Sequence, residues 1–295
     1  MNMRVESYLT ERRKLVEETL TQSLADDSIP VTLRKAMEYS LRAGGKRLRP
    51  ILVIAGAEAV GGSAASVVPI ASALEMIHTF SLVHDDLPAM DDDDLRRGKP
   101  TNHKVFGEAT AILAGDGLLA EAFSVLSRVA HDSDPMLIIE VIRDIADATG
   151  ARGMTGGQLI DMESVGAKLD ETRLTHLHSM KTGRLITVSV TSGAKFCKAP
   201  ASQVEALRRY GECIGLAFQI ADDILDIEGS QEEIGKDVGS DMANNKATYP
   251  AIIGLEASRQ KARMLVDRAV TALSIFDERA DPLREIARYT IERRK

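Results

Sequence analysis

Tryptophan is absent from this sequence, and cysteine occurs only twice, at Cys197 and Cys213. The two cysteines match no metal-ligand spacing and cannot form a disulfide framework, which excludes a cysteine-stapled fold and a thiolate zinc site. We recognise neither a signal-like N-terminus nor an apolar run of about 18 residues. We therefore expect a cytoplasmic protein without a membrane span.

The sequence has fewer basic residues (37 Lys and Arg) than acidic residues (44 Asp and Glu). The formal net charge is -7 and the pI is about 5.5. Proteins that bind nucleic acid through bulk charge carry the opposite sign, so we expect no nucleic-acid partner. Basic clusters are significant against this acidic background.

Strand signals are also missing, because no four-residue alternation of apolar and polar residues recurs between turn signals. Apolar residues recur at helical spacing instead, and the hydrophobic fraction of 44% is enough for a substantial core. There is no linker-like Ser/Pro-rich tract. We predict an all-α fold, a single domain over residues 1–295 built as a bundle of about ten or more helices.

Glycine, proline and acidic runs separate the predicted helices. These helices are a peripheral N-terminal helix within 1–30, then 31–42, the apolar segment 51–60, 64–85, 108–130, 135–149, 158–163, 172–192, 202–228, 248–255, 257–276 and 282–293. Residues 87–106 are expected to form a polar loop, and Gly150–Gly157 a kink or turn. Residues 229–246 suit a mobile lid, although a solvated surface loop explains their composition equally well.

Two acidic clusters each follow a long apolar helical run. The first is HDDLPAMDDDD at 84–94 and the second is FQIADDILD at 218–226. Carboxylates this dense repel one another and cost desolvation energy unless a cation lies between them. Magnesium suits such oxygen sites, taking one or two carboxylates and completing its octahedron with water and phosphate oxygens. The clusters therefore predict a magnesium clamp for a di- or triphosphate.

Spacing indicates which carboxylates cooperate. Asp222 and Asp226 are four residues apart on one helix face, which Gln219 shares. A helix-capping role fits poorly, because these acids lie toward a helix C-terminus, where the macrodipole disfavours them. Asp85 and Asp91 align on no regular helix, so the chain must loop outward between them to bring both to one metal. An EF-hand is set aside because its required spacing is missing.

Basic residues that can hold phosphate oxygens form three groups. The groups are Lys46 with Arg49, Arg96 with Arg97, and Lys181 with Lys236 and Lys246. Either Arg96 or Arg97 could instead simply neutralise the adjacent aspartates. His78 falls on nearly the same helix face as Asp85, although a histidine there is by itself more simply a core residue. Because neither a nucleophile elbow nor a P-loop occurs, the phosphate is expected to be a leaving group.

Together these motifs resemble those of the short-chain trans-prenyl diphosphate synthases, most closely the bacterial farnesyl diphosphate synthases. The resemblance runs from about Lys46 to the C-terminus. It includes GGKRLRP at 44–50, HDDLPAMDDDDLRRGKPTNH at 84–103, GGQLIDM at 156–162, Lys181-Thr182-Gly183, FQIADDILD at 218–226, GK at 235–236 and NKATYP at 245–250. Two Asp-rich motifs in this order, with these flanks, are highly specific.

The resemblance implies a homodimeric helical bundle around a deep central cavity. It implies condensation of isopentenyl diphosphate with dimethylallyl or geranyl diphosphate, head to tail (1′-4, trans), to farnesyl diphosphate. Three Mg²⁺ ions, for which Mn²⁺ can substitute, would hold the allylic diphosphate. By position, the implied metal ligands are Asp85, Asp91 and Asp222, supported by Asp86 and Asp226. The implied allylic-diphosphate ligands are Arg96, Lys181, Lys236 and Lys246, and the implied isopentenyl-diphosphate ligands are Lys46, Arg49, His78 and Arg97. The tail Arg293-Arg294-Lys295 resembles a basic segment that helps cover the site.

The chemistry implied is ionisation of the allylic diphosphate to a carbocation shielded from water. The Lys181 carbonyl, the Thr182 hydroxyl and the Gln219 amide oxygen would stabilise the cation by their dipoles. No side chain is an obvious base for the last proton, so the released diphosphate is the natural candidate. In the family, product length depends on the fifth and fourth positions before the first Asp, here Phe80 and Ser81. The ring of Phe80 favours a fifteen-carbon product, although ordinary core packing also explains it.

Three alternatives remain beside a farnesyl diphosphate synthase. A geranylgeranyl diphosphate synthase would use the same site. A class I terpene cyclase shares the first motif, but its second motif mixes Asn/Asp, Ser/Thr and Glu, whereas here that motif is all Asp. A non-catalytic partner subunit is disfavoured by the intact acids in both motifs.

Overall fold

The computed structural model describes residues 3–129, 134–228 and 246–292 and is 79% helical, which confirms the all-α prediction. The longer helices are α1 (Met3–Ser23), α2 (Val31–Leu41), α3 (Leu48–Ala59), α4 (Ala64–Asp85), α6 (Glu108–Arg128), α7 (Pro135–Thr149), α8 (Met154–Glu163), α10 (Arg184–Phe196), α11 (Ala201–Glu228), α15 (Leu255–Ala272) and α16 (Asp281–Glu292). The shorter elements are α5 (Asn102–Phe106), α9 (Glu171–His178), a π-helical turn (Ser179–Gly183), α14 (Tyr249–Ile253), 3₁₀ turns at Leu273–Ile275 and Glu278–Ala280, and strands β1 (Leu95–Arg96) and β2 (Lys99–Pro100).

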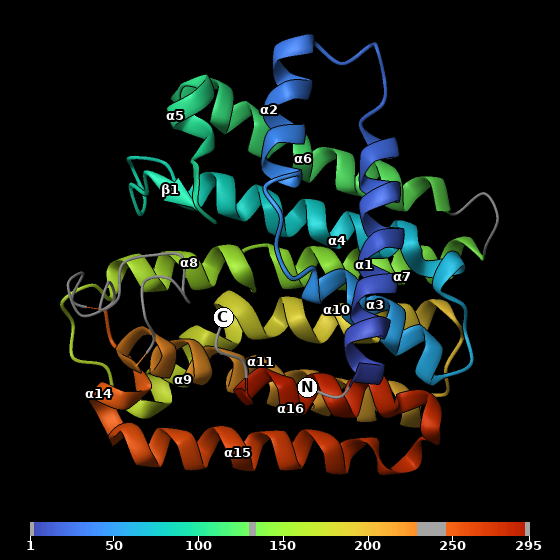
Figure 1. Cartoon of the computed structure of the whole chain (residues 1–295), viewed down its shortest axis with the longest axis vertical. Helices are drawn as coiled ribbons and strands as arrows, with labels where there is room; N and C mark the ends of the chain where they lie inside the picture. Colours follow the sequence, from blue (N-terminus) through green and yellow to red (C-terminus); the bar gives the residue numbers. More distant parts are fainter. Residues whose placement is uncertain (1–2, 130–133, 229–245, 293–295) are drawn as a thin grey trace.

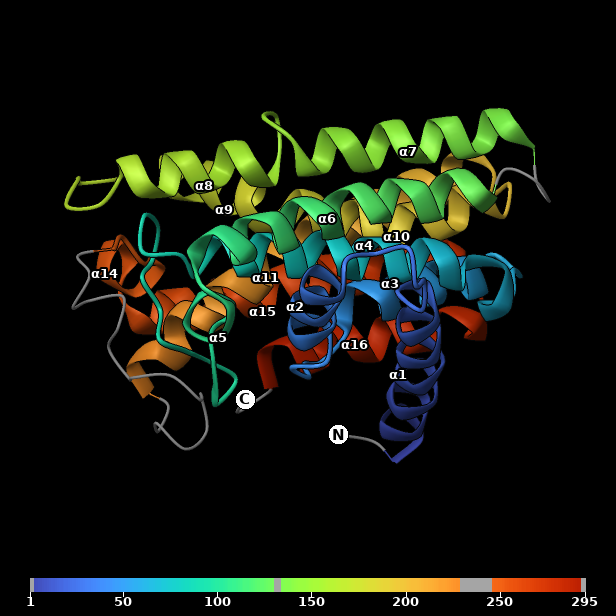
Figure 2. The same cartoon turned by 90° about the horizontal axis from the view of Figure 1, so that it is seen from above.

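The helices form layers. In Figure 1, α4, α10, α11 and α15 run in roughly the same direction, while α1 and α2 cross them steeply. Figure 2 shows α7 and α8 nearly in line along one face, with α6 beneath them. Helix α4 packs against α3 and α6, and α11 packs against α10 and α15. The first acidic cluster therefore begins at the end of one long, covered helix, and the second lies within another.

Helices α3 and α10 form the central layer between two apolar cores. Both contribute residues to the core around α4 and to the core around α11. Nearly every side chain of α3 is buried, as expected for a helix that is apolar on all sides. The central layer thus fixes the distance between the helix that carries the first acidic cluster and the helix that carries the second.

Two glycines allow the backbones of α3 and α10 to approach one another. A Cβ atom at Gly56 would collide with the carbonyl oxygen of Val190, and a Cβ atom at Gly193 would collide with the carbonyl oxygen of Val53. The approach is reciprocal, so each helix supplies a glycine opposite the other's main chain. Interior packing at this density leaves no room for a methyl group.

Several predicted boundaries were wrong. Residues 87–106 are not only loop, because β1 and β2 pair antiparallel there and α5 follows. Part of the predicted Gly150–Gly157 turn is helical, since α8 begins at Met154. Its glycines serve close packing, as a Cβ at Gly157 would collide with the backbone of Lys181. The predicted helix 172–192 is divided by the π-helical turn and extends to Phe196. Most of the predicted lid (229–245) and the tail 293–295 lie outside the described residues.

The expectation that no apolar run reaches membrane-spanning length also needs correction. Among the described residues, α4 and α6 are long and apolar enough by length and composition alone. In α4, 67% of the most apolar 18-residue window is buried inside the structure, and in α6 the corresponding share is 39%. Two such helices are weak support for a membrane span, because the core helix of a soluble protein passes the same test.

Replacing Gly56 with alanine should lower the free energy of unfolding by about 1–3 kcal/mol, because the methyl group overpacks the contact between α3 and α10. The sign is diagnostic, since Gly→Ala inside an ordinary helix stabilises by roughly 0.5–1 kcal/mol. Urea unfolding of G56A and G193A measures the effect. An unchanged or raised unfolding free energy in both variants would contradict the close backbone contact.

Candidate functional site

The first acidic cluster begins where α4 ends. The backbone N–H of Asp91 donates a 2.9 Å hydrogen bond to the carbonyl oxygen of Asp85, and Met90 and Asp92 bond back to Leu87. Asp92 adopts positive φ (52°), a conformation that Asp tolerates better than most residues. The chain therefore loops out after α4 and returns Asp91 to the backbone of Asp85.

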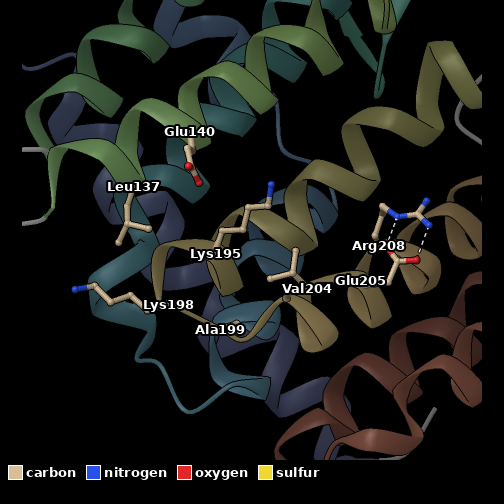
Figure 3. A pocket seen from close by; sticks show the side chains of 9 residues that line it. Leu137, Glu140, Lys195, Lys198, Ala199, Val204, Glu205 and Arg208 are labelled. Carbon is tan, nitrogen blue, oxygen red and sulfur yellow. Dashed lines mark hydrogen bonds and ion pairs between the residues drawn. The ribbon is translucent and has the colours of Figure 1, made fainter.

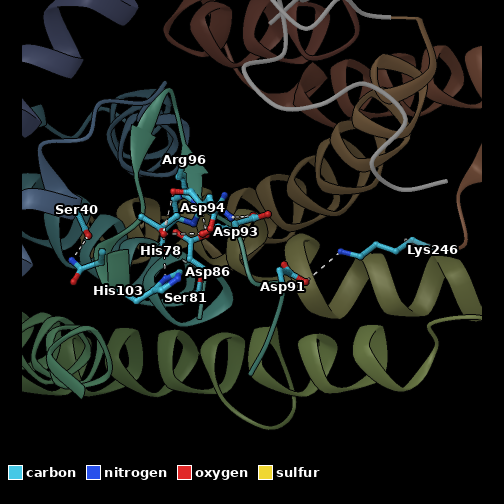
Figure 4. A network of polar contacts seen from close by, with 12 residues as sticks. Ser40, His78, Ser81, Asp86, Asp91, Asp93, Asp94, Arg96, His103 and Lys246 are labelled. Atoms are coloured by element: carbon cyan, nitrogen blue, oxygen red, sulfur yellow. Dashed lines mark hydrogen bonds and ion pairs between the residues drawn. The ribbon is translucent and has the colours of Figure 1, made fainter. Parts of the chain in front are cut away.

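The two neighbouring aspartates of this cluster have different surroundings. Burial raises the pKa of Asp85 to about 6, against the opposing effect of Lys181. Burial also raises the pKa of Asp86 to about 6, but Asp86 accepts a 2.5 Å hydrogen bond from Nε of Arg96. Arg96 also binds Asp93 at 3.1 Å (Figure 4). Arg96 thus lies between Asp86 and Asp93 and offsets their negative charge, while its role toward a phosphate stays a prediction.

The second cluster lies on α11 opposite the π-helical turn. Gln219 and Asp222 share a helix face, with Gln219 Nε2 3.4 Å from Asp222 Oδ2. The hydroxyl of Thr182, in the π-helical turn, donates a 2.5 Å hydrogen bond to Oε1 of Gln219. Asp226 is buried one turn further on. Single π-helical turns inside α-helical segments occur frequently at functional sites. The structure therefore brings Thr182, Gln219 and Asp222 together.

Two of the predicted phosphate-binding lysines converge on Asp161 of α8. Nζ of Lys181 is 2.6 Å from Asp161 Oδ2, and Nζ of Lys246 is 4.0 Å from the same oxygen. Lys246 also lies 3.5 Å from Asp91 (Figure 4). Asp161 belongs to the GGQLIDM motif, but it was not among the predicted site residues. The signal in the sequence was its i, i+3 spacing from Gln158, which places an amide and a carboxylate on one helix face.

The predicted isopentenyl-diphosphate ligands come from three segments. Burial lowers the pKa of Arg49 to about 10, and burial together with Arg49 and Arg97 lowers the pKa of His78 well below its ordinary value. His78 is therefore neutral near pH 7. Arg97, at the turn between β1 and β2, donates a hydrogen bond to the carbonyl oxygen of Gly44. A Cβ at Gly45 would collide with that guanidinium, so the glycine makes the contact feasible.

Asp223, which the sequence analysis passed over, supports the fold next to the site. Its Oδ2 accepts a 2.8 Å hydrogen bond from the backbone N–H of Tyr249 and lies 3.6 Å from Nε2 of His178. The rings of His178 and Tyr249 stack at 5.8 Å. Asp223 thereby fixes the start of α14, three residues after Lys246. Because neighbouring helix positions point in different directions, only one member of the pair Asp222-Asp223 can face Gln219.

The two predicted chain-length residues lie on α4 facing different neighbours. The ring of Phe80 meets the ring of His84 edge-on, with centroids 5.3 Å apart, and packs against the core around α4. Nε2 of His84 lies 3.0 Å from the carbonyl oxygen of Ile112, and Gly115 leaves room for the imidazole. The hydroxyl of Ser81 donates a 2.9 Å hydrogen bond to the carbonyl oxygen of His78. Phe80 is therefore packed against His84, whose imidazole in turn contacts α6.

The donor set fits magnesium better than a metal that needs a ready-made cage. Within residues 3–129, 134–228 and 246–292, no three His, Cys, Asp or Glu side chains converge on one point. Magnesium needs only one or two carboxylates and takes its other ligands from water and phosphate. Lys236 and the residues 293–295 lie outside the described residues, and their roles stay predictions.

Two depressions open elsewhere on the described surface. One of about 360 Å³ lies between α7 and the start of α11 and contains no predicted site residue (Figure 3). Two of its basic groups are already paired, since Lys195 pairs with Asp144 and Arg208 with Glu205. The other, of about 170 Å³, lies between α1 and α16 and includes Lys46 and Phe218. The deep central cavity implied by the resemblance stays a prediction.

Comparison with known proteins agrees with these features. The family model described as polyprenyl synthetase matches residues 30–278. The farnesyl diphosphate synthase of Bacillus subtilis (strain 168) is 45% identical over 97% of both chains. The geranylgeranyl diphosphate synthase of Cyanophora paradoxa is 46% identical over 99% of this chain and 97% of its own. The apo crystal structure of an FPP/GFPP synthase from Zymomonas mobilis matches with a TM-score of 0.87 and 37% identity, covering 99% of this chain and 100% of that one.

Replacing Asp223 with alanine should lower the free energy of unfolding by about 1–3 kcal/mol, because the buried N–H of Tyr249 loses its acceptor. D223N retains an acceptor oxygen and should lose less. Urea unfolding of the two variants makes the comparison. Equal stability of D223A and the parent protein would show that Asp223 does not anchor α14.

Proposed function

The chain belongs to the polyprenyl synthetase family, whose members elongate prenyl diphosphates, and we propose that it makes farnesyl diphosphate. The substrates we propose are isopentenyl diphosphate and, as allylic partner, dimethylallyl or geranyl diphosphate. The bond formed is the 1′-4 head-to-tail link with trans geometry. The family assignment and the prenyl-elongating activity are as predicted from the motifs.

One observation carries the proposed site: adjacent residues of the π-helical turn interact with the two acidic clusters. Lys181 acts electrostatically on Asp85 of the first cluster. Thr182 binds Gln219 beside Asp222 of the second. A diphosphate held between the clusters would therefore meet an ammonium group and a hydroxyl from one short segment. This arrangement supports a site for a polyanion and its counter-cations.

Magnesium, of which we propose three ions held by Asp85, Asp91 and Asp222, would supply positive charge to the departing diphosphate when bound. Asp86 and Asp226 would support these ligands. The predicted lysines and Arg96 add further positive charge around the allylic diphosphate. The oxygen of Thr182 and the carbonyl of Lys181 lie on the same turn, where their dipoles can face the carbocation that ionisation leaves. The attacking isopentenyl group would be oriented by Lys46, Arg49, His78 and Arg97.

Water must be kept from this carbocation, and the last proton must leave. Near the π-helical turn, Asp161 already pairs with Lys181 and lies close to Lys246, which favours the released diphosphate as the proton acceptor. His78 is a weak base here, because burial and the neighbouring arginines lower its pKa.

Product length distinguishes the two closest candidates. Phe80 is large, partly buried and wedged against His84, which supports a tunnel floor that stops at fifteen carbons. A geranylgeranyl product is the second candidate, because a geranylgeranyl diphosphate synthase is as similar in sequence as the farnesyl diphosphate synthases.

The proposal includes a cytoplasmic homodimer whose subunit is one domain. Helix α6 exposes Ile112 and Leu113, 44% and 58% accessible, which gives an apolar strip for a second copy. The shared central layer of α3 and α10 supports treating the chain as one folding unit. Light scattering coupled to size exclusion tests the dimer.

Incubation with isopentenyl and geranyl diphosphates and Mg²⁺ should yield the fifteen-carbon product, and EDTA should abolish the reaction until Mg²⁺ is restored. Replacing Phe80 with alanine should shift the products to twenty carbons or more, because the floor is lowered. Separation of products by chain length gives the readout. A twenty-carbon product from the parent protein would transfer the proposal to a geranylgeranyl diphosphate synthase.

Replacing Asp85 with alanine should lower kcat by about two or more orders of magnitude, as expected for the loss of an electrostatic catalytic group, while the fold persists. The matched control is D92N, in the same acidic run, which keeps a residue tolerant of positive φ. D92N should retain turnover within about twofold. Near-normal turnover of D85A, with circular dichroism unchanged, would refute the magnesium clamp.

A further inference from the structure

Arg47 of the GGKRLRP motif is turned into the fold, between two predicted substrate-binding residues. Its side chain has no exposed surface. Nε donates a 2.7 Å hydrogen bond to Glu17 of α1, and one terminal nitrogen donates a 2.6 Å hydrogen bond to Glu75 of α4. The other terminal nitrogen donates to the carbonyl oxygen of Leu41 at the end of α2. One guanidinium thus joins three helices.

The backbone at Arg47 is held in a conformation that this residue does not favour by itself. Arg47 has φ 52° and ψ 35° and immediately precedes α3. A non-glycine residue in this left-handed region costs roughly 1–2 kcal/mol. Lys46, which precedes the turn, is exposed, and the helix that carries Arg49 begins directly after the turn. The contacts of the guanidinium therefore hold the turn that separates these two residues.

Glu75 is the partner that links this turn to the rest of the predicted isopentenyl-diphosphate ligands. It is 2% exposed in the otherwise apolar middle of α4 and precedes His78 by three residues, which places both on one face. The same carboxylate acts electrostatically on Arg49 and on Arg97. A buried carboxylate is costly unless it is paired, and hydrophobic residues of similar volume often serve stability equally well. Stability alone gives weak reason for its presence.

We propose that the buried ion pair of Arg47 and Glu75 positions the isopentenyl-diphosphate ligands. Glu75 fixes the left-handed turn through Arg47, and it offsets the mutual repulsion of Arg49, Arg97 and the neighbouring cationic groups before the substrate arrives. Neither residue touches the substrate, so both are positioning residues. The inference rests on the proposed function, because it assumes that Lys46, Arg49, His78 and Arg97 bind isopentenyl diphosphate.

The decisive variant is the double substitution R47M/E75M, which removes both charges together and leaves no buried unpaired ion. Glu17 keeps solvent contact, with 34% of its side chain exposed, so water can hydrate it. We expect the KM for isopentenyl diphosphate to rise about tenfold or more, because misplaced binding groups lose much of their effect. The KM for geranyl diphosphate should change less than about twofold, and Tm should stay within a few degrees.

A matched control breaks a different ion pair. D144N removes the carboxylate that pairs with Lys195 between α7 and α10, and neither residue belongs to the predicted site. It should leave both KM values unchanged. R47K retains the positive charge, but a lysine cannot reach all three partners at once. It should therefore also raise the KM for isopentenyl diphosphate. R47K provides the test if the double variant does not fold.

Calorimetric titration of isopentenyl diphosphate without Mg²⁺ gives a second readout that needs no turnover. Weaker binding by R47M/E75M than by the parent protein supports the inference. Unchanged binding and unchanged KM in both R47M/E75M and R47K overturn it, as do equal rises in the two KM values. A parent protein that neither binds nor consumes isopentenyl diphosphate overturns the proposed function instead.

Discussion

Repulsion among carboxylates at the polar ends of apolar helices is the constraint on which the rest of this structure depends. Helix α4 delivers Asp85 and Asp86 at the end of a buried run, and α11 does the same with Asp222 and its neighbours. Burial raises the pKa of Asp85 and Asp86. Neighbouring elements place basic side chains next to aspartates in this region. These side chains are Arg96 of the β1–β2 hairpin, Lys181 of the π-helical turn and Lys246 before α14. An arriving diphosphate with its magnesium ions would enter this existing balance of charge.

A division of labour recurs in both Asp pairs. In the first pair, Asp85 interacts with Lys181, whereas Asp86 is tied to Arg96. In the second, Asp222 lies beside Gln219, whereas Asp223 is tied to the backbone of Tyr249. Consecutive helical residues differ by about 100° in direction, so the two members of each pair meet different partners.

The helical fold and the charged clusters at helix ends could be predicted because both depend on local pattern: apolar residues at helical spacing, and dense charge where those residues stop. The supporting contacts could not. Glu75 is 28 residues from Arg47 in sequence, and Asp161 is 20 residues from Lys181. Nothing in the spacing along the chain pairs them. The glycines of 150–157 were predicted as a kink or turn because glycine breaks helices in isolation, whereas here Gly157 permits close packing against Lys181.

The contact between α3 and α10 has a consequence for motion. Packed helices ordinarily slide by small shifts of interlocking side chains between rotamers. At Gly56 and Gly193 there are no rotamers to exchange, and backbone meets backbone. Backbone contact at these two glycines restricts sliding of α3 against α10. We therefore expect the motions that let a lengthening hydrocarbon enter or leave to lie in the outer helices, on either side of this central layer.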